Sequence, residues 1–137
     1  MELRARESRD RGPYTFGKLP VVGAGGGSIP ASILTAPSVG TATADGCTGA
    51  NVTTNQIGGT LYWAVVTNGG SCTDAQLIAG AGGNIVSGKA GNQAVVAPVK
   101  QTIADITGLT GSTTYQIKFL QVNNSTNSVQ ASVSLLI

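Results

Sequence analysis

The chain of 137 residues contains no histidine and only two cysteines. Histidine is the commonest general base and metal ligand, so its absence removes the Ser-His and Cys-His arrangements of nucleophilic enzymes. Asp45, Asp74 and Asp105 fall on three separate segments, and nothing in their spacing indicates a paired acid–base site. The sequence therefore predicts a protein that is not an enzyme and has no catalytic, cofactor-binding or metal-binding residues.

Charged residues make up only 10% of the chain and aromatic residues only 4%. A soluble domain usually has roughly 25% charged residues, and the hydrophobic fraction of 41% argues against disorder along the whole chain. Every 18-residue window contains glycine, proline or polar residues, so we expect no transmembrane helix and no membrane partner. The first seven residues lack the apolar run of a secretory signal, so we expect synthesis in a cytoplasm.

The first 18 residues hold most of the charge. Five basic and three acidic residues give this segment +2, whereas the three lysines and three aspartates that follow cancel. A nucleic-acid-binding arm normally carries basic residues without interleaved acids, but here the acids alternate with the arginines. The pattern is typical of salt bridges between proteins, so we expect a protein partner and no nucleic acid. A solvated, disordered tail is the alternative.

Residues 13–37 are typical of an extended connector, with four prolines and a flexible glycine-rich run at 23–28. No Lys-Ser/Thr pair follows that run, which excludes a phosphate-binding loop. The apolar residues of the connector cannot form a core of their own, so we expect them to anchor in a neighbouring protein. The partner-binding residues expected in this arm, residues 1–32, are Arg4, Arg6, Arg9, Arg11, Tyr14, Phe16, Leu19, Val21 and Val22.

From about residue 33 the sequence indicates short strands. Residues 60–67 (TLYWAVVT) are rich in aromatic and β-branched residues, with Leu61, Trp63 and Val65 on one face, and Trp63 is expected in the core. Residues 57–59 are predicted to be a hairpin connection into this strand. The further strands are expected at 51–56, 92–98, 99–106, 113–122 and 128–137, with a polar turn at 123–127.

One segment departs from the strand pattern. Thr73 followed by Gln76 forms a capping box, and Gly80 closes a helix of one or two turns. Short strands at this spacing favour an antiparallel sandwich. We therefore expect an all-β fold, a single seven-stranded antiparallel β-sandwich over residues 33–137, with one short helix and an extended N-terminal arm.

Residues 107–115 (TGLTGSTTY) resemble the loop between the fifth and sixth strands of fibronectin type III domains. In that loop a leucine, here Leu109, plugs the core. A tyrosine, here Tyr115, bonds its hydroxyl back to the loop as a tyrosine corner. The resemblance implies that both residues are buried, together with Ile117 and Phe119 on the strand that follows.

Three further segments occur in order: 59–67 (GTLYWAVVT), 74–80 (DAQLIAG) and 91–95 (GNQAV). They resemble the fibronectin type III-like (Ig-like) domains of tailed-bacteriophage virion proteins, and the resemblance covers residues 33–137. The loop before the helix is short, and the final hairpin turn is rich in Asn, Ser and Thr. These departures change the loops through which such domains bind ligands, so no binding residue is carried over.

The resemblance implies a non-enzymatic structural protein located in the virion. Within that class we expect a capsid decoration (cement) protein that attaches through its N-terminal arm. Its expected partners are the major capsid protein or other virion proteins, in many copies per particle, and self-association into a homo-oligomer stays open. The alternatives are a small tail, neck or collar component, and a surface carbohydrate- or receptor-binding module.

Cys47 and Cys72 lie in two glycine-rich loops, one before the second strand and one after the third. In a fibronectin type III-like sandwich these loops emerge at the same end, so a disulfide is within reach. Closing a loop of about 25 residues would stabilise the fold by roughly 3 kcal/mol. Cytosolic synthesis favours two reduced thiols instead, so the sequence leaves both states open.

Overall fold

The computed structural model of the protein describes residues 30–137. The predicted partner-binding residues, from Arg4 to Val22, lie outside the described residues. Residues 31–137 form a unit of their own that consists mostly of strands in antiparallel sheets, with one short helix. The expectation of an antiparallel, mostly β fold with a single short helix is confirmed.

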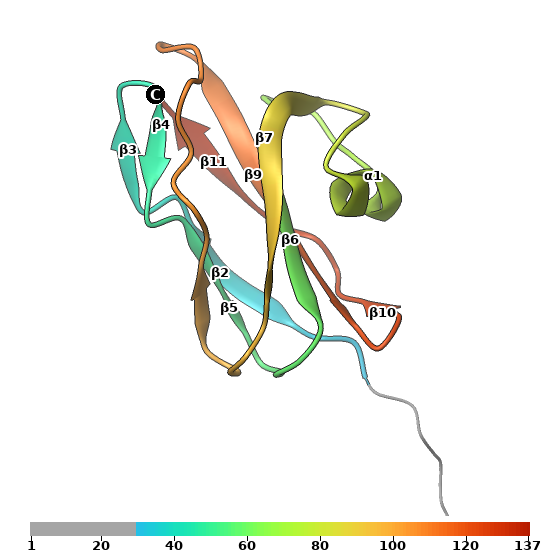
Figure 1. Ribbon diagram of the computed structural model, residues 1–137. Coiled ribbons are helices and arrows are strands. Elements are labelled where there is room, and N and C mark those ends of the chain that lie inside the picture. Colours follow the sequence, from blue (N-terminus) through green and yellow to red (C-terminus); the bar gives the residue numbers. More distant parts are fainter. Residues whose placement is uncertain (1–29) are drawn as a thin grey trace, which may run out of the picture. The chain divides into compact units, whose positions relative to one another are not determined.

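The larger sheet has five strands and is built around β6 (Thr60–Thr67). β6 pairs on one side with β7 (Ile85–Ala94) and on the other with β9 (Thr114–Asn123). β10 (Thr126–Asn127) and β11 (Ala131–Leu136) both pair with β9, on the edge that β6 leaves free. All these pairings are antiparallel, and β7 and β11 form edges of the sheet (Figure 1).

The second sheet has three strands, β2 (Leu34–Ser38), β5 (Asn51–Thr54) and β8 (Lys100–Thr102), with β5 in the centre. A small hairpin of β3 (Thr41–Thr43) and β4 (Gly46–Thr48) lies between β2 and β5 along the chain. Cys47 of β4 also forms an isolated antiparallel bridge with Ile106, which follows β8 along the chain.

Alternate residues of β6 point to opposite faces of the larger sheet, as the period of two requires. Leu61, Trp63 and Val65 enter the main core, and Ala64 lies on the other face. The main core also takes residues from the three-stranded sheet, such as Val52, so it lies between the two sheets. The five residues expected in the core are all buried, which confirms the prediction: Trp63, Leu109, Tyr115, Ile117 and Phe119.

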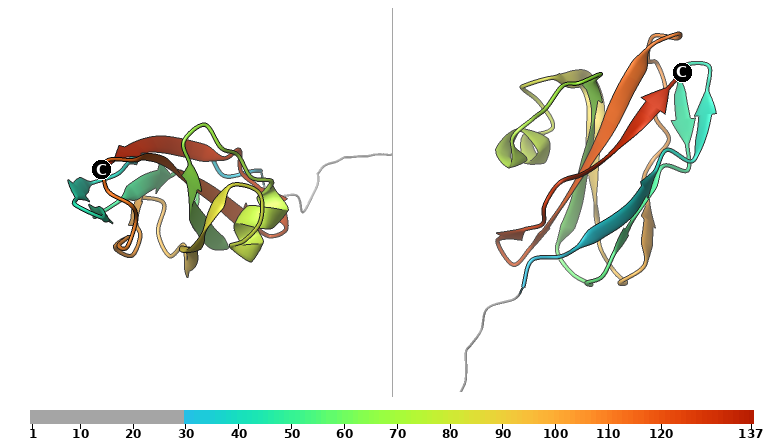
Figure 2. Two further views of the ribbon diagram at one scale, coloured as in Figure 1. Left: turned by 90° about the horizontal axis from the view of Figure 1, so that it is seen from above. Right: turned by 180° about the vertical axis from the view of Figure 1, so that it is seen from behind.

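The helix α1 (Asp74–Ala79) has the predicted capping box. The Thr73 hydroxyl accepts a hydrogen bond from the Gln76 backbone N–H at 3.1 Å, and the Gln76 side chain accepts one from the Thr73 N–H at 2.9 Å. Gly80 ends the helix with a φ of 73°, a conformation that favours glycine. Leu77 packs with Ala64 and Leu120, so α1 lies on the outer face of the five-stranded sheet (Figure 2).

The predicted tyrosine corner is present. The Tyr115 hydroxyl accepts a hydrogen bond from the backbone N–H of Thr110 at 3.1 Å. At the same end of the unit, the backbone N–H of Leu109 donates to the carbonyl of Asp45 at 2.8 Å. The loop at 107–111 is therefore fixed both to the start of β9 and to the β3–β4 hairpin.

Two strands differ most from the predicted bounds. The strand expected at 92–98 begins at Ile85 and ends at Ala94, and β8 spans only Lys100–Thr102 of the expected 99–106. Gly88 and Gly91 lower the strand propensity of the first part of β7, which hid it from the sequence pattern. Gly91 is required there because its position lies against the Trp63 ring.

The predicted hairpin connection at 57–59 is wrong. β5 pairs with β2 and β8, whereas β6 pairs with β7 and β9, so this link crosses from one sheet to the other. The buried side chain of Gln121 on β9 donates hydrogen bonds to the carbonyls of Gln56 at 3.0 Å and Gly58 at 2.8 Å. These bonds replace the ladder that a hairpin would have made.

Candidate functional site

Two of the described carboxylates have structural partners. One oxygen of Asp45 accepts a hydrogen bond from the Gly108 backbone N–H at 2.9 Å. The oxygens of Asp74 accept hydrogen bonds from the side-chain amides of Asn127 at 2.9 Å and Gln130 at 2.7 Å. These bonds hold α1 against β10 and the link that follows it. Within residues 30–137 there is no group of three His, Cys, Asp or Glu side chains that could hold a metal ion.

The two cysteines are free thiols. Cys47 is buried in the core between the sheets, whereas Cys72 packs beside Leu77 on the outer face of the five-stranded sheet. Because the five-stranded sheet separates these two clusters, the geometry expected for a Cys47–Cys72 disulfide is not found in this structure.

Both thiols are also poor nucleophiles. Burial raises the pKa of Cys47, and the negative charge of Asp105 raises it further. Burial raises the pKa of Cys72 as well. The positive charge of Lys118 lowers this pKa, and the negative charge of Asp74 raises it, with burial as the largest of the three effects. Each thiol is therefore held in its protonated form at neutral pH, which agrees with a structural role.

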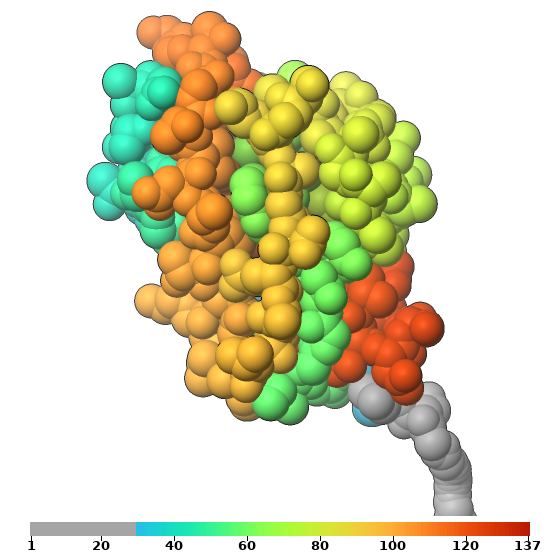
Figure 3. Space-filling view, in the orientation of Figure 1, coloured from blue at the N-terminus to red at the C-terminus, as the bar shows by residue number. Residues whose placement is uncertain are grey.

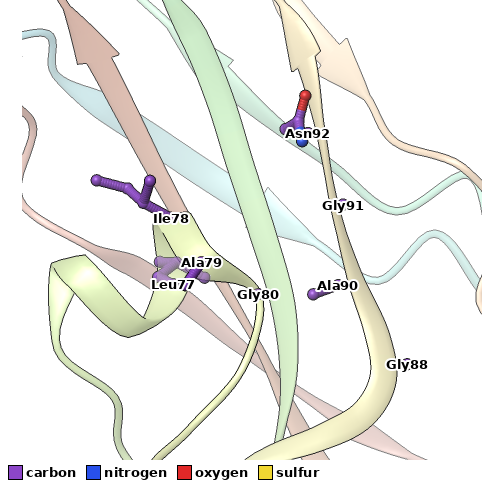
Figure 4. A pocket seen from close by; sticks show the side chains of 8 residues that line it. All are labelled: Leu77, Ile78, Ala79, Gly80, Gly88, Ala90, Gly91 and Asn92. Carbon is purple, nitrogen blue, oxygen red and sulfur yellow. The ribbon is translucent and has the colours of Figure 1, made fainter.

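A hollow of about 180 Å³ lies between α1 and β7 (Figure 4). Leu77 and Ile78 line it from the helix, and Ala90 and Asn92 line it from the strand. Among its lining residues Asn92 is the only one with a polar side chain, and none is aromatic or titratable. Such a hollow lacks the aromatic and charged side chains that commonly line a specific small-molecule site.

The most distinctive surface feature is a group of exposed aliphatic side chains at one end of the unit. Seven large hydrophobic residues are exposed in the described part of the chain, and four of them belong to segments that meet at this end. We call these four residues the apolar tip: Ile33 (58% exposed), Ile57 (56%), Val96 (75%) and Val99 (53%).

Backbone hydrogen bonds bring these segments together. The N–H of Asn55 donates to the carbonyl of Ile33, and the N–H of Thr54 donates to the carbonyl of Val99, both at 3.3 Å. The N–H of Gly58 donates to the carbonyl of Val95 at 2.9 Å. The two links, 55–59 and 95–99, therefore lie side by side at the lower end of the unit (Figures 1 and 3).

Buried amides hold the tip in place. The Gln121 side chain is fully buried, and its oxygen accepts a hydrogen bond from the Thr54 hydroxyl while its nitrogen bonds the 56–58 backbone. The Asn123 side chain donates to the carbonyl of Ile57 and to the side-chain oxygen of Gln56, both at 3.0 Å. With both sides of the link fixed to β9, the Ile57 side chain stays on the surface.

Sequence reasoning missed the tip because apolar residues at strand ends resemble core residues. The sequence pattern places Val96 and Val99 in strands and Ile57 in a hairpin. One signal was available: Gln121 occupies an inward position two residues after Phe119, and a polar residue at such a position predicts a buried amide that binds backbone groups nearby.

We found no match to this chain among protein-family models, curated proteins or solved structures. Among the helices of residues 30–137, none is long and apolar enough to cross a membrane.

Proposed function

We propose that this protein is a non-enzymatic structural component of a tailed-bacteriophage virion. Within the virion we assign it to the capsid surface as a decoration (cement) protein, present in many copies and bound to the major capsid protein or a neighbouring virion protein. The arm of residues 1–32 provides the attachment, and the domain that follows is displayed on the shell.

For the fold we propose a seven-stranded fibronectin type III-like sandwich. Two antiparallel sheets that share one core support this proposal. β10 and β11 pair with successive parts of the same edge of β9, so they count as one interrupted strand. With β3 and β4 taken as extensions of β2 and β5, the larger sheet has four strands and the smaller has three.

The bond between Tyr115 and Thr110 supports the family assignment. It occupies the loop that the sequence resemblance identified, and Leu109 is buried beside it. Many sandwiches contain such a corner. The virion setting therefore rests on the resemblance of the ordered segments 59–67, 74–80 and 91–95, as a hypothesis that the experiment below tests.

The observation that carries the docking role is the apolar tip at the end where the arm joins the domain. The four arginines and five apolar residues that we expect to bind a partner all lie within the first 22 positions of the arm. Arginine and aromatic residues are the usual anchors of protein interfaces. A domain with only six charged residues after position 18 suits display on a shell better than electrostatic recognition of a charged ligand.

A carbohydrate- or receptor-binding role has less support. Sugar sites usually present an aromatic platform, but Trp63 and Tyr115 are buried and the hollow beside α1 has no aromatic lining. We therefore expect the isolated 31–137 fragment not to bind host cells or polysaccharide. Saturable binding by that fragment would favour this alternative.

The proposed attachment is tested by deleting residues 1–18 and adding the protein to particles made without it. Extended, about 30 residues reach up to roughly 100 Å, enough to cross more than one subunit. We expect the full-length chain to decorate the particles and the deletion variant to stay in solution with an unchanged melting transition. Full occupancy by the deletion variant would show that the arm is not the anchor.

A further inference from the structure

We infer that the apolar tip is a second contact surface for the same partner protein that holds the arm. The inference rests on the proposed function and adds the part of the domain that faces the partner. The tip requires a protein surface that is apolar where it meets Ile57 and Val96, and acidic at its border near Lys100.

The arm joins the domain at the end that carries the tip, because Pro30 lies only three residues before Ile33, a member of the tip. From Val22, the last of the predicted partner-binding residues, the chain has 11 residues to Ile33, a span of at most about 40 Å. A partner that binds the arm through Val22 is therefore kept within reach of the tip.

The bound arm tethers the domain to the partner, which explains why a contact surface of only four side chains suffices. Once the arm is bound, contact by the tip is an intramolecular step, and short linkers give effective concentrations in the millimolar range. A patch too small to bind a partner alone then contributes to the overall affinity. The amides of Gln121 and Asn123 already fix the 55–59 link, so little conformational freedom is lost when the tip binds.

Charge indicates which surface fits. Exposed Lys100 follows Val99 directly, while Asp45 lies at the opposite end of the unit with Gly108, and Asp74 lies on α1. Asp105 is close enough to Cys47 to raise its pKa and therefore also lies away from the tip. Acidic groups on the partner complement this distribution. A second copy does not, because pairing tip to tip would bring two Lys100 side chains together.

The test compares two double variants of the full-length chain on particles made without this protein. Ile57→Ser with Val96→Ser removes two tip side chains, and Val129→Ser with Leu136→Ser removes two equally apolar side chains elsewhere, which are 86% and 69% exposed. We expect the tip variant to raise the apparent Kd by about tenfold or more, and the control to change it less than about twofold. Melting transitions of both variants show whether they are folded.

A charge variant gives an independent readout. Lys100→Glu should weaken binding to the particles, and the loss should shrink as salt is added because exposed charges are screened. Lys118→Glu, on β9 and away from the tip, is its matched control. Equal loss in the two lysine variants would contradict an acidic border on the partner.

The outcomes separate the two proposals. If the wild-type chain does not bind the particles, the proposed function fails and this inference falls with it. If the wild type binds and the tip variant binds as tightly as the control, the arm proposal stands and the inference is overturned. Sedimentation of the wild type as a dimer, with the tip variant as a monomer, would assign the tip to a second copy and also overturn it.

Discussion

The indole ring of Trp63 lies so close to Gly91 that a β-carbon at residue 91 would be only 2.8 Å from the Cζ2 atom of the ring. The two residues are directly paired across β6 and β7. The largest side chain of the core therefore packs over the backbone of an edge strand, and this contact explains why a residue with poor strand propensity occurs in β7.

Gly91→Ala should destabilise the domain by about 1–3 kcal/mol, the usual cost of adding a methyl group to a packed core. The new methyl group would displace the Trp63 ring or force β7 outward. Urea unfolding followed by Trp63 fluorescence measures the change. Asn92→Ala is the matched control, because Asn92 is exposed and its side chain points to the other face of the sheet; equal stability of the two variants would contradict the packing described here.

Tyr115→Phe should cost about 0.5–1.5 kcal/mol, because it leaves the backbone N–H of Thr110 without its acceptor. Amide hydrogen exchange at Thr110 should become faster, while exchange in the middle of β9 changes little. Tyr62→Phe removes a hydroxyl for which the described residues provide no hydrogen bond, so its stability should match the wild type. Unchanged exchange at Thr110 would show that the tyrosine corner does not hold the loop.

Gln121→Leu should destabilise the domain by about 1–3 kcal/mol, the range for leaving buried polar groups unsatisfied. The substitution removes the partners of the Thr54 hydroxyl and of two backbone carbonyls in the 56–58 link. Gln116→Leu, on the same strand but on the outer face and half-buried, should have little effect. If both variants unfold at the same urea concentration, the buried amide is not what fixes the link.

The thiols predict a pH dependence. Because the pKa of Cys47 is raised in the folded state above its ordinary value of 9.0, the unfolded chain loses this proton first as the pH rises. The stability that the protonated thiol contributes is thus fully present below pH 9 and is lost as the pH rises through the folded-state pKa.

Wild type should therefore lose more unfolding free energy between pH 7 and pH 10 than Cys47→Ala does. Each variant is compared with itself at the two pH values, so the loss of stability caused by the cavity at residue 47 drops out of the difference. Cys72→Ala should differ less from wild type, since Lys118 acts against the rise in the pKa of that thiol. An equal loss in wild type and Cys47→Ala would contradict a buried, protonated Cys47.

Local patterns were sufficient to predict several features of the fold. The alternation around Trp63 predicted its face of β6, and the Thr73–Gln76 pair predicted the start of α1. The resemblance of residues 107–115 to a fibronectin type III loop implied the hydrogen bond of the Tyr115 hydroxyl. Each depends on residues no more than a few positions apart, so the sequence contains the whole pattern.

The features that the sequence did not predict depend on contacts between distant segments. The 57–59 link became a crossover because Gln121, more than 60 residues away, bonds its carbonyls. Gly91 is tolerated in β7 only because Trp63 covers it. The apolar tip is formed by links that meet only after the sheets have assembled, so no local pattern distinguishes Val96 from a core valine.

The central claim, attachment to the capsid through the arm, is tested most directly by an electron cryo-microscopy map of particles that carry this protein. We expect density for the 31–137 domain at many symmetry-related positions on the outer capsid surface, with the apolar tip and Pro30 facing the shell. Density confined to the tail, neck or collar, or a domain bound with the tip facing solvent, would contradict the account.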